Sequence, residues 1–343
     1  MKKPLVSVVM PTRNAAATIG DSVRSLQTQD LQDIEIVLVD HASDDATAGI
    51  LEAFAKKDSR IRLFRCDGSF VEAANLAWEE AASDLIARMD SDDVSHPARL
   101  SSQIQFLREN PGLDACCTQV RILKRASETG EVIPADGGYS RYESWVNSVV
   151  THEEISAQRF IDSPIPNPTM MIKRDVLQSL GGYEDPTWAE DYDFWLRFLQ
   201  DNYRIGKVQT PLLDWFDSPN RSTRTVPRYE QDQFQIAKAH FLARIESLRT
   251  HGVMIWGAGP IGKQMAKLLQ DENIMVHCFI EVNDRKIGNK INGVEVVDFK
   301  DLNTLSSLPI LLSAVGNHIA RERIRSEAGR TNRVEGEDFF CVA

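Results

Sequence analysis

Short apolar runs alternate with amphipathic stretches along the first ninety residues of this chain. Four of the runs have the length and composition of buried strands, and they cover residues 5–10, 34–39, 61–64 and 84–89. Between them, apolar residues recur at helical spacing, as Ile19, Val23 and Leu26 do. Strands separated by helices predict βαβ units and therefore an α/β fold, with a mainly parallel sheet covered by helices on both faces.

A second alternating pattern begins after residue 250. A helical stretch over 229–248 leads into it, and its apolar runs predict strands at 253–256, 274–280, 294–297, 310–315 and 339–342. The 343 residues are enough for two domains. We therefore expect a first α/β domain over 1–225, a helical linker over 226–250 and a small Rossmann-like α/β domain over 251–343.

Composition excludes several classes of protein. A net charge of −11 argues against a nucleic-acid-binding surface, which needs a basic stripe. No run approaches the ~18 apolar residues of a membrane span, so we expect none, although peripheral membrane association stays open. The apolar stretch 5–10 is too short for a signal peptide, and the five cysteines show no CxxC spacing. These features predict a cytoplasmic protein in a reducing compartment.

The fourth strand ends in three carboxylates within four residues, Asp90, Asp92 and Asp93. In an extended chain, positions i and i+2 project to the same side, so Asp90 and Asp92 are expected to face one point beyond the strand. Such hard oxygen ligands suit Mn²⁺ or Mg²⁺. The alternative interpretation is a solvated acidic turn ahead of a helix.

The other strand ends also deliver polar residues to the edge where open α/β sheets bind ligands. They are expected to form a nucleotide-binding crevice. The residues concerned are Pro11, Thr12 and Arg13 after the first strand, Asp40 after the second, and Arg65 and Asp67 after the third.

Three of these blocks resemble the signature segments of family 2 glycosyltransferases: Val6 to Asn14, Asp40 to Thr47, and Met89 to Asp93. A fourth block, Gly181-Gly-Tyr183 followed by Trp188 to Phe198, resembles the family's acceptor-side segment with its Glu-Asp pair. The resemblance covers about 200 residues. It implies the GT-A fold and, for most members, inverting transfer of a sugar from a nucleotide sugar.

The resemblance also implies roles for individual residues. Asp92 becomes the direct metal ligand, with Asp90 beside it and nearer the ribose. Inversion needs a base on the opposite face of the sugar, and the family pattern favours Asp191 over its neighbour Glu190. The alternative for both is a stabilising charge in the first turn of a helix.

The nucleoside side of the site follows from the same resemblance. Asp40 is expected to hold the uracil or ribose, with the backbone of Pro11 to Arg13 lining the base and Arg65 or Asp67 completing the pocket. Asn75 resembles an asparagine that follows the family's third strand, although a helix-surface amide is an equal alternative.

Two segments depart from the family pattern. Asn167-Pro-Thr169 stands where many members have His-Pro-Thr, and a Tyr-Arg-x-His segment is replaced by Trp215-Phe-Asp217 and then Asn220-Arg-Ser222. Arg221 is the candidate partner of the pyrophosphate, since a guanidinium matches phosphate geometry. A surface loop arginine is the alternative.

The predicted second domain carries Gly257-Ala-Gly259-Pro-Ile-Gly262 between a strand and a helix, with Glu281 at the end of the next strand. This is the arrangement that places a pyrophosphate on a helix start and an acidic side chain on a ribose. The module resembles small domains attached to some sugar-modifying enzymes. It is expected to bind a nucleotide, a nucleotide sugar or NAD, or else to serve only as a docking domain.

Together these features predict a metal-dependent, inverting glycosyltransferase. We expect a nucleoside-diphosphate sugar donor, with a UDP sugar favoured. The acceptor would be a hydroxyl of a glycan, a lipid-linked intermediate or a small molecule, in the synthesis of a cell-surface polysaccharide. Two alternatives stay open, a sugar nucleotidyltransferase and a catalytically silent binding or scaffold protein. A nucleotidyltransferase normally has a glycine-rich early loop, and residues 10–14 contain no glycine.

Overall fold

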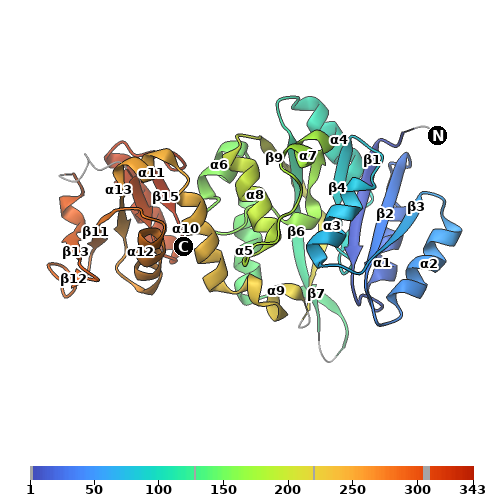
Figure 1. Ribbon diagram of the computed structural model, residues 1–343, viewed down its shortest axis with the longest axis horizontal. Helices are drawn as coiled ribbons and strands as arrows, with labels where there is room; N and C mark the ends of the chain where they lie inside the picture. Colours follow the sequence, from blue (N-terminus) through green and yellow to red (C-terminus); the bar gives the residue numbers. More distant parts are fainter. Residues whose placement is uncertain (1–2, 127–128, 219–220, 304–309) are drawn as a thin grey trace. The chain divides into compact units, whose positions relative to one another are not determined.

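A computed structural model describes residues 3–126, 129–218, 221–303 and 310–343. The chain forms two compact units: one comprises 1–155, 165–186 and 190–225, and the other comprises 156–164, 187–189 and 226–343. The element order can be followed in Figure 1. Residues 226–250, which we expected to form a linker, belong to the second unit.

The strands of the first unit belong to one mixed sheet, which has nine strands within the described residues, in the order β3-β2-β1-β4-β8-β6-β9-β5 with β7 beside β6. Strands β3, β2, β1 and β4 are parallel, whereas β8 is antiparallel to both of its neighbours. The strands are β1 (Val6–Thr12), β2 (Ile34–His41), β3 (Ile61–Cys66), β4 (Leu85–Arg88), β5 (Val94–Ser95), β6 (Ala115–Arg125), β7 (Val132–Pro134), β8 (Met171–Lys173) and β9 (Ile205–Asp217).

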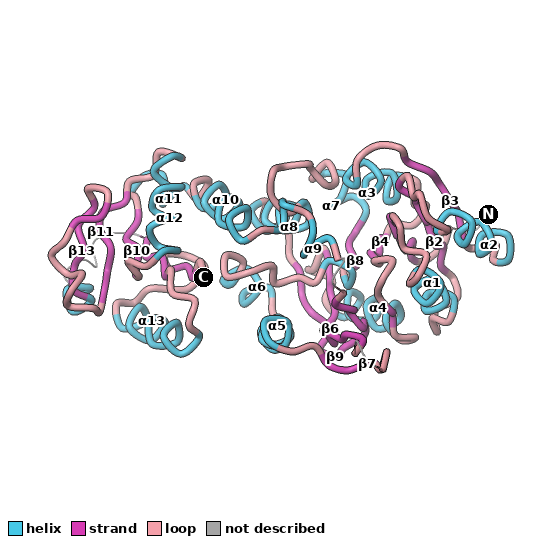
Figure 2. The backbone as a smooth tube through the Cα atoms, turned by 90° about the horizontal axis from the view of Figure 1, so that it is seen from below, coloured by secondary structure: helices cyan, strands magenta, loops and turns pink. Residues whose placement is uncertain are grey.

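Helices cover both faces of this sheet, as the turned view in Figure 2 shows. Helices α3, α7 and α8 lie on one side, and α1, α4 and α5 lie on the other. The helices are α1 (Ile19–Gln27), α2 (Thr47–Lys57), α3 (Phe70–Glu79), α4 (Arg99–Glu109), α5 (Gly137–Ser148), α6 (His152–Gln158, which runs into the second unit), the 3₁₀ turn η1 (Asn167–Thr169), α7 (Arg174–Ser179), α8 (Glu190–Gln200) and α9 (Ser222–Thr225).

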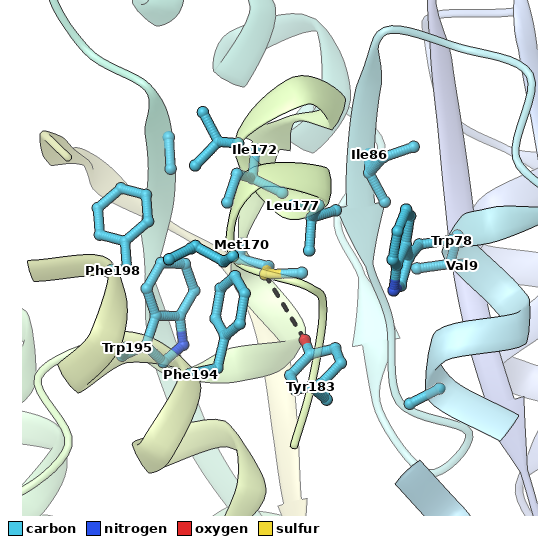
Figure 3. Close-up of a cluster of buried hydrophobic side chains, with 14 of the residues drawn as sticks. Val9, Trp78, Ile86, Met170, Ile172, Leu177, Tyr183, Phe194, Trp195 and Phe198 are labelled. Atoms are coloured by element: carbon cyan, nitrogen blue, oxygen red, sulfur yellow. Dashed lines mark hydrogen bonds between the residues drawn. The ribbon is translucent and has the colours of Figure 1, made fainter. Parts of the chain in front are cut away.

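Alternate residues of the central strands are buried on opposite faces of the sheet. Val8 and Met10 belong to one apolar cluster, while Val9 between them belongs to the other. The cluster around Val9 contains the aromatic face of α8, with Phe194, Trp195 and Phe198 (Figure 3). Because α8 is fixed by this buried face, the acidic residues at its first turn are also fixed relative to the sheet.

The second unit has its own sheet, in the order β12-β13-β11-β10-β14-β15, and all strands except β12 are parallel. The order reverses direction at β10 and β14, and open α/β sheets bind ligands at such a point. Its elements are η2 (Pro227–Tyr229), α10 (Gln231–Leu242), α11 (Glu246–His251), β10 (Val253–Trp256), α12 (Pro260–Asp271), β11 (Val276–Glu281), β12 (Lys290–Ile291), β13 (Val294–Asp298), η3 (Phe299–Asn303), β14 (Ile310–Ser313), α13 (His318–Arg330) and β15 (Phe339–Cys341).

The predicted α/β fold is confirmed, with local differences. Strand β1 continues to Thr12 rather than ending at Met10, because it stays paired with β2 up to the register pair Thr12 and Asp40. The stretch 229–248 is not one helix: α10 ends at Leu242, and α11 begins at Glu246.

Candidate active site

The acidic turn after β4 gathers three carboxylates at one point. One oxygen from each of Asp90, Asp92 and Asp93 lies within 4.8 Å of the others. Asp93 is fully buried, and its Oδ1 accepts the backbone N–H of Phe216 at 3.0 Å, which fixes the turn against β9. Its Oδ2 is buried and has no hydrogen-bond partner among the described residues. Burial raises the pKa of Asp92 and of Asp93. An all-oxygen set with an unsatisfied buried oxygen fits a hard divalent cation.

Arg221 brings a positive charge to the same three carboxylates. Its guanidinium lies 3.6 Å from Asp90, 3.6 Å from Asp92 and 3.4 Å from Asp93. The group is 9% exposed, donates to the carbonyl of Phe216 at 2.7 Å and lies 4.5 Å above the Trp215 ring. Burial would lower the pKa of Arg221, but the neighbouring carboxylates raise it overall. Arg221 is therefore not a surface loop arginine, while its predicted contact with a pyrophosphate stays a prediction. Asn220 beside it lies outside the described residues.

The ends of β1 and β2 lie side by side, at the place where the sequence predicts the nucleoside to bind. Pro11, Thr12 and Asp40 are buried and adjacent, whereas the Arg13 side chain is exposed. Asp40 is only 5% exposed, yet its Oδ1 has no hydrogen-bond partner within the described part of the chain. An unsatisfied buried carboxylate oxygen at a strand end is the kind of group that a ligand hydroxyl or N–H would satisfy.

Side chains tie the turn after β1 to the turn after β2. Ser43 and Thr47 accept the backbone N–H groups of Asn14 and Ala15, at 3.0 and 2.8 Å. The Asn14 side chain in turn accepts the N–H of Asp44 at 3.0 Å. In addition, the N–H of Ala16 donates to the Asp45 carboxylate at 3.1 Å. The two turns therefore form one rigid wall beside Asp40.

Three other predicted site residues lie on β3, in the turn after it and on α3. Arg65 is exposed and pairs with Glu52 at 2.7 Å, and Asp67 is exposed in the turn after β3. The Asn75 carbonyl oxygen accepts the backbone N–H of Tyr183 and the Trp78 indole N–H, while its amide donates to the Tyr183 carbonyl at 2.9 Å. Asn75 thus joins α3 to the loop ahead of α8, and its predicted contact with a nucleotide stays a prediction.

The Glu-Asp pair lies in the first turn of α8. Glu190 is 4% exposed, and Asp191 is half-buried with its Oδ1 accepting the N–H of Tyr192 at 2.7 Å. Burial, followed by the charges of Glu190 and Asp90, raises the pKa of Asp191 to about 7. A carboxylate that titrates near neutral pH has the property expected of a general base.

Asp193, two residues further along, stabilises the local structure through an ion pair. It forms an ion pair with Arg197 at 2.7 Å, and Arg197 also donates to the carbonyls of Leu180 and Gly182 at 2.7 and 2.8 Å. These bonds hold the glycine turn that precedes the Glu-Asp pair.

One residue of this region was missed by the sequence prediction. Arg88, the last residue of β4, is 3% exposed and donates to Asp90 at 2.9 Å. Its charge also lowers the pKa of Asp191. The available signal was an arginine inside an apolar strand two positions before Asp90, which a buried strand does not normally contain.

In the second unit, the glycine loop follows β10 as predicted. A side chain at Gly262 would place its Cβ 1.9 Å from the Gly257 carbonyl oxygen, so this position needs glycine, while the space at Gly259 is open. Glu281 ends β11 and pairs with Lys286 at 2.8 Å, and the Lys286 ammonium also donates to the Ala258 carbonyl at 3.3 Å. The expected acidic residue is therefore present but engaged by a cation near the glycine loop.

Comparison with known proteins identifies the class of the chain. Over 78% of its length it is similar to the solved structure of Staphylococcus aureus TarS residues 1–349 in complex with UDP-GlcNAc, of which it covers 80%, with a TM-score of 0.53 at 18% identity. This likeness and the parallel-dominated first sheet establish the GT-A fold. The family model "Glycosyl transferase family 2" matches residues 7–181, and the chain belongs to this family and is a glycosyltransferase.

Other matches agree with this assignment. The chain is 29% identical over 224 residues to the O-antigen biosynthesis glycosyltransferase WbnJ of Escherichia coli, covering 64% of the chain and 82% of the relative. It is 28% identical over 225 residues to the uncharacterized glycosyltransferase MJ1057 of Methanocaldococcus jannaschii, covering 64% of the chain and 73% of the relative.

The family model "C2185-like, N-terminal" matches residues 250–331. Among the described helices, none is long and apolar enough to cross a membrane.

Proposed function

We propose that the chain is a metal-dependent, inverting glycosyltransferase that moves a sugar from a UDP sugar to a hydroxyl acceptor in the synthesis of a cell-surface polysaccharide. The observation that carries this proposal is the geometry of the acidic turn after β4, where one oxygen from each of Asp90, Asp92 and Asp93 lies within 4.8 Å of the others. The charge of Asp90 also raises the pKa of Asp191 at the start of α8. This supports the proposal that the site of the leaving group and the base belong to the same active site.

The carboxylate cluster would take the leaving-group side of the reaction. Asp92 and Asp90 would hold Mn²⁺ or Mg²⁺, with Asp93 keeping the turn in place. A bound divalent cation supplies charge neutralisation for the diphosphate and acts as a Lewis acid. Arg221, which already lies on this cluster, would pair with a phosphate oxygen.

Asp191 would act on the acceptor side. In an inverting displacement it takes the proton of the acceptor hydroxyl while that oxygen bonds to the anomeric carbon. The bond from this carbon to the diphosphate oxygen breaks, and the nucleoside diphosphate leaves with the electron pair. With a pKa of about 7, about half of the Asp191 carboxyl groups would be ionised at neutral pH and able to accept a proton.

The nature of the donor and of the product is inferred from relatives. TarS residues 1–349 have been solved in complex with UDP-GlcNAc and with UDP, and WbnJ is an O-antigen biosynthesis glycosyltransferase. On this basis we favour a UDP sugar and a bacterial surface glycan, and we place Pro11, Thr12, Arg13 and Asp40 around the nucleoside. A cytoplasmic location and the kind of acceptor stay predictions.

The test is release of nucleoside diphosphate by the purified full chain from a panel of UDP, GDP and dTDP sugars, with Mn²⁺ and with EDTA. We expect release from a UDP sugar that depends on metal and is lost in Asp92→Asn, while Asp185→Asn, an exposed acid ahead of α8, behaves like the wild type. Turnover that persists in EDTA would contradict metal dependence. Pyrophosphate release from a nucleoside triphosphate and a sugar phosphate would instead favour a nucleotidyltransferase.

A second ligand is proposed for the second unit. We infer that the loop from Gly257 to Gly262 binds a nucleotide or a nucleotide sugar. Three observations support it: the open space at Gly259, the ammonium of Lys286 at the loop, and the buried hydroxyl of Ser313. Ser313 ends β14 beside β10, and its hydroxyl has no hydrogen-bond partner in the part of the chain that the structure describes. Calorimetry on the full chain with Gly259→Val compared to wild type would test this, since one class of nucleotide site should disappear. Unchanged binding stoichiometry in Gly259→Val favours the docking-domain alternative.

A further inference from the structure

The acidic residue at the end of β11 already has partners within the chain. Glu281 Oε1 accepts the backbone N–H groups of Val282 and Asn283, at 2.9 and 3.4 Å, and its Oε2 lies 2.8 Å from the ammonium of Lys286. In dinucleotide-binding folds, a carboxylate at this position accepts the hydroxyls of a ribose. Here both oxygens accept from the protein, and the residue is only 8% exposed. A ribose would have to compete with these donors.

Lys286 brings a positive charge to the glycine loop between β10 and α12. Its ammonium also donates to the carbonyl of Ala258, between Gly257 and Gly259, at 3.3 Å. An ammonium has three donors, so the carboxylate of Glu281 and this carbonyl leave one N–H for solvent or a ligand. The side chain is 40% exposed, so a ligand on the loop can reach the charge.

The loop itself offers room and hydrogen-bond donors to an anion. A side chain at Gly259 would meet no atom within 4 Å. The helix α12 begins at Pro260, and no side chain caps its first backbone N–H groups. The hydroxyl of Ser313, in register with Trp256 just ahead of the loop, is fully buried and has no hydrogen-bond partner in the described parts of the chain. The helix start and the ammonium are two separate positive positions, one for each phosphate of a diphosphate.

We propose that the second unit recognises its ligand by a diphosphate rather than by a ribose. Lys286 is the phosphate-binding residue, and Glu281 is a positioning residue that holds the ammonium against the glycine loop. The ligand is therefore a nucleoside diphosphate or its sugar ester, bound whatever the 2′ position of the ribose carries. This inference rests on the proposed function, which takes the loop from Gly257 to Gly262 as a nucleotide site.

The test follows a signal next to the loop in the full chain. Trp256 ends β10 immediately before Gly257, so protein labelled with fluorotryptophan can be titrated by ¹⁹F NMR, with the Trp256 signal assigned by its loss in Trp256→Phe. We expect UDP and 2′-deoxyuridine diphosphate to shift this signal with Kd values that agree within about twofold. Inorganic pyrophosphate should shift it as well, whereas uridine at the same concentrations should not.

Variants assign the charge to Lys286. Lys286→Gln should raise the Kd for UDP about tenfold, on the order of one charge-assisted hydrogen bond, while Lys286→Arg keeps the charge and should retain most of the affinity. Lys267→Gln is the matched control, since it removes an exposed lysine further along α12. Glu281→Gln should weaken UDP and pyrophosphate by the same factor, because the carboxylate acts through the ammonium. A ribose contact would weaken UDP alone.

The outcomes distinguish this inference from the nucleotide site on which it rests. If UDP binds equally well to Lys286→Gln and to wild type, the nucleotide site stands and the role of Lys286 is overturned. If 2′-deoxyuridine diphosphate binds about tenfold more weakly than UDP, the inference is also overturned, since the site then recognises the ribose. If neither UDP nor pyrophosphate shifts the Trp256 signal at millimolar concentration, both the inference and the nucleotide site are wrong.

Discussion

The ionised form of Asp191, which the proposed reaction needs, should lower the stability of the folded protein. Its pKa rises from the ordinary 3.8 to about 7 on folding, so the folded state binds this proton more tightly than the unfolded chain does. The stability that the proton provides is fully present below about pH 4 and is lost as the pH rises through 7. At about 1.4 kcal/mol per unit, the three-unit shift corresponds to roughly 4 kcal/mol at pH 8 as an upper bound.

Asp191→Asn replaces this carboxylate with a neutral group of the same size. The variant should therefore unfold at a higher temperature than wild type at pH 8, and the difference should shrink towards zero at pH 4. Thermal unfolding across this pH range measures it, with Asp185→Asn as the exposed control. A variant that is equally destabilised at every pH would show that folding does not raise the pKa of Asp191. The assignment of Asp191 as the base would then lose its support.

The same substitution has a kinetic signature. With a pKa of about 7, wild-type kcat/KM should be about tenfold lower at pH 6 than at pH 8, because the base must be ionised. Asp191→Asn should lower turnover by about 10²–10⁴ fold and abolish this acid limb, with donor binding nearly intact by calorimetry. If Glu190→Gln is inactive and Asp191→Asn active, the roles of the two acids are exchanged.

Three further predictions concern other residues. Asp92→Asn should weaken donor binding in the presence of Mn²⁺ at least tenfold while its thermal unfolding stays cooperative, and calorimetry that finds wild-type affinity would remove Asp92 from the metal set. Asp40→Asn should raise the Kd for UDP about tenfold, on the order of one charge-assisted hydrogen bond, without moving the acid limb of the pH profile; equal UDP binding in both proteins would contradict a nucleoside contact. Gly262→Ala should destabilise the second unit by at least 1 kcal/mol, since its Cβ would lie 1.9 Å from the Gly257 carbonyl oxygen, and a denaturation midpoint equal to that of wild type would show that the loop yields easily.

The α/β class and the position of the acidic turn could be predicted because both depend on local pattern. A buried strand that ends in Asp90 and Asp92 is visible as an apolar run followed by charges, and the alternating runs give the parallel strands. The long strands β6 and β9 were not predicted. Residues along β6 change from buried to half-exposed, and its pairing with β9 shifts register near Gln119. Neither strand shows a continuous apolar run in the sequence.

The parts that the sequence did not predict depend on contacts between distant segments. Arg221 was named as a candidate site residue, but its contacts with Asp90, Asp92 and Asp93, more than a hundred residues away, could not be read from its own neighbourhood. Asn75 shows the same dependence on distant contacts, because its side chain is hydrogen-bonded to the backbone of Tyr183, more than a hundred residues further along the chain. The assignment of 156–164 to the second unit likewise follows from packing that no local pattern records.

The side-chain hydrogen bonds between the turns after β1 and β2 limit how a phosphate could be bound by the backbone there. In many nucleotide-binding proteins, free backbone N–H groups of such a turn cradle the phosphates. Here the N–H groups of Asn14, Ala15 and Ala16 are already bonded to Ser43, Thr47 and Asp45. This wall can shape a nucleoside pocket but has few amides left for an anion. Under the proposed function, the charge of the diphosphate would therefore be balanced elsewhere in the site, by cations at the acidic turn. Affinity for a charged donor should accordingly fall with salt and metal chelation far more steeply than affinity for the uncharged nucleoside.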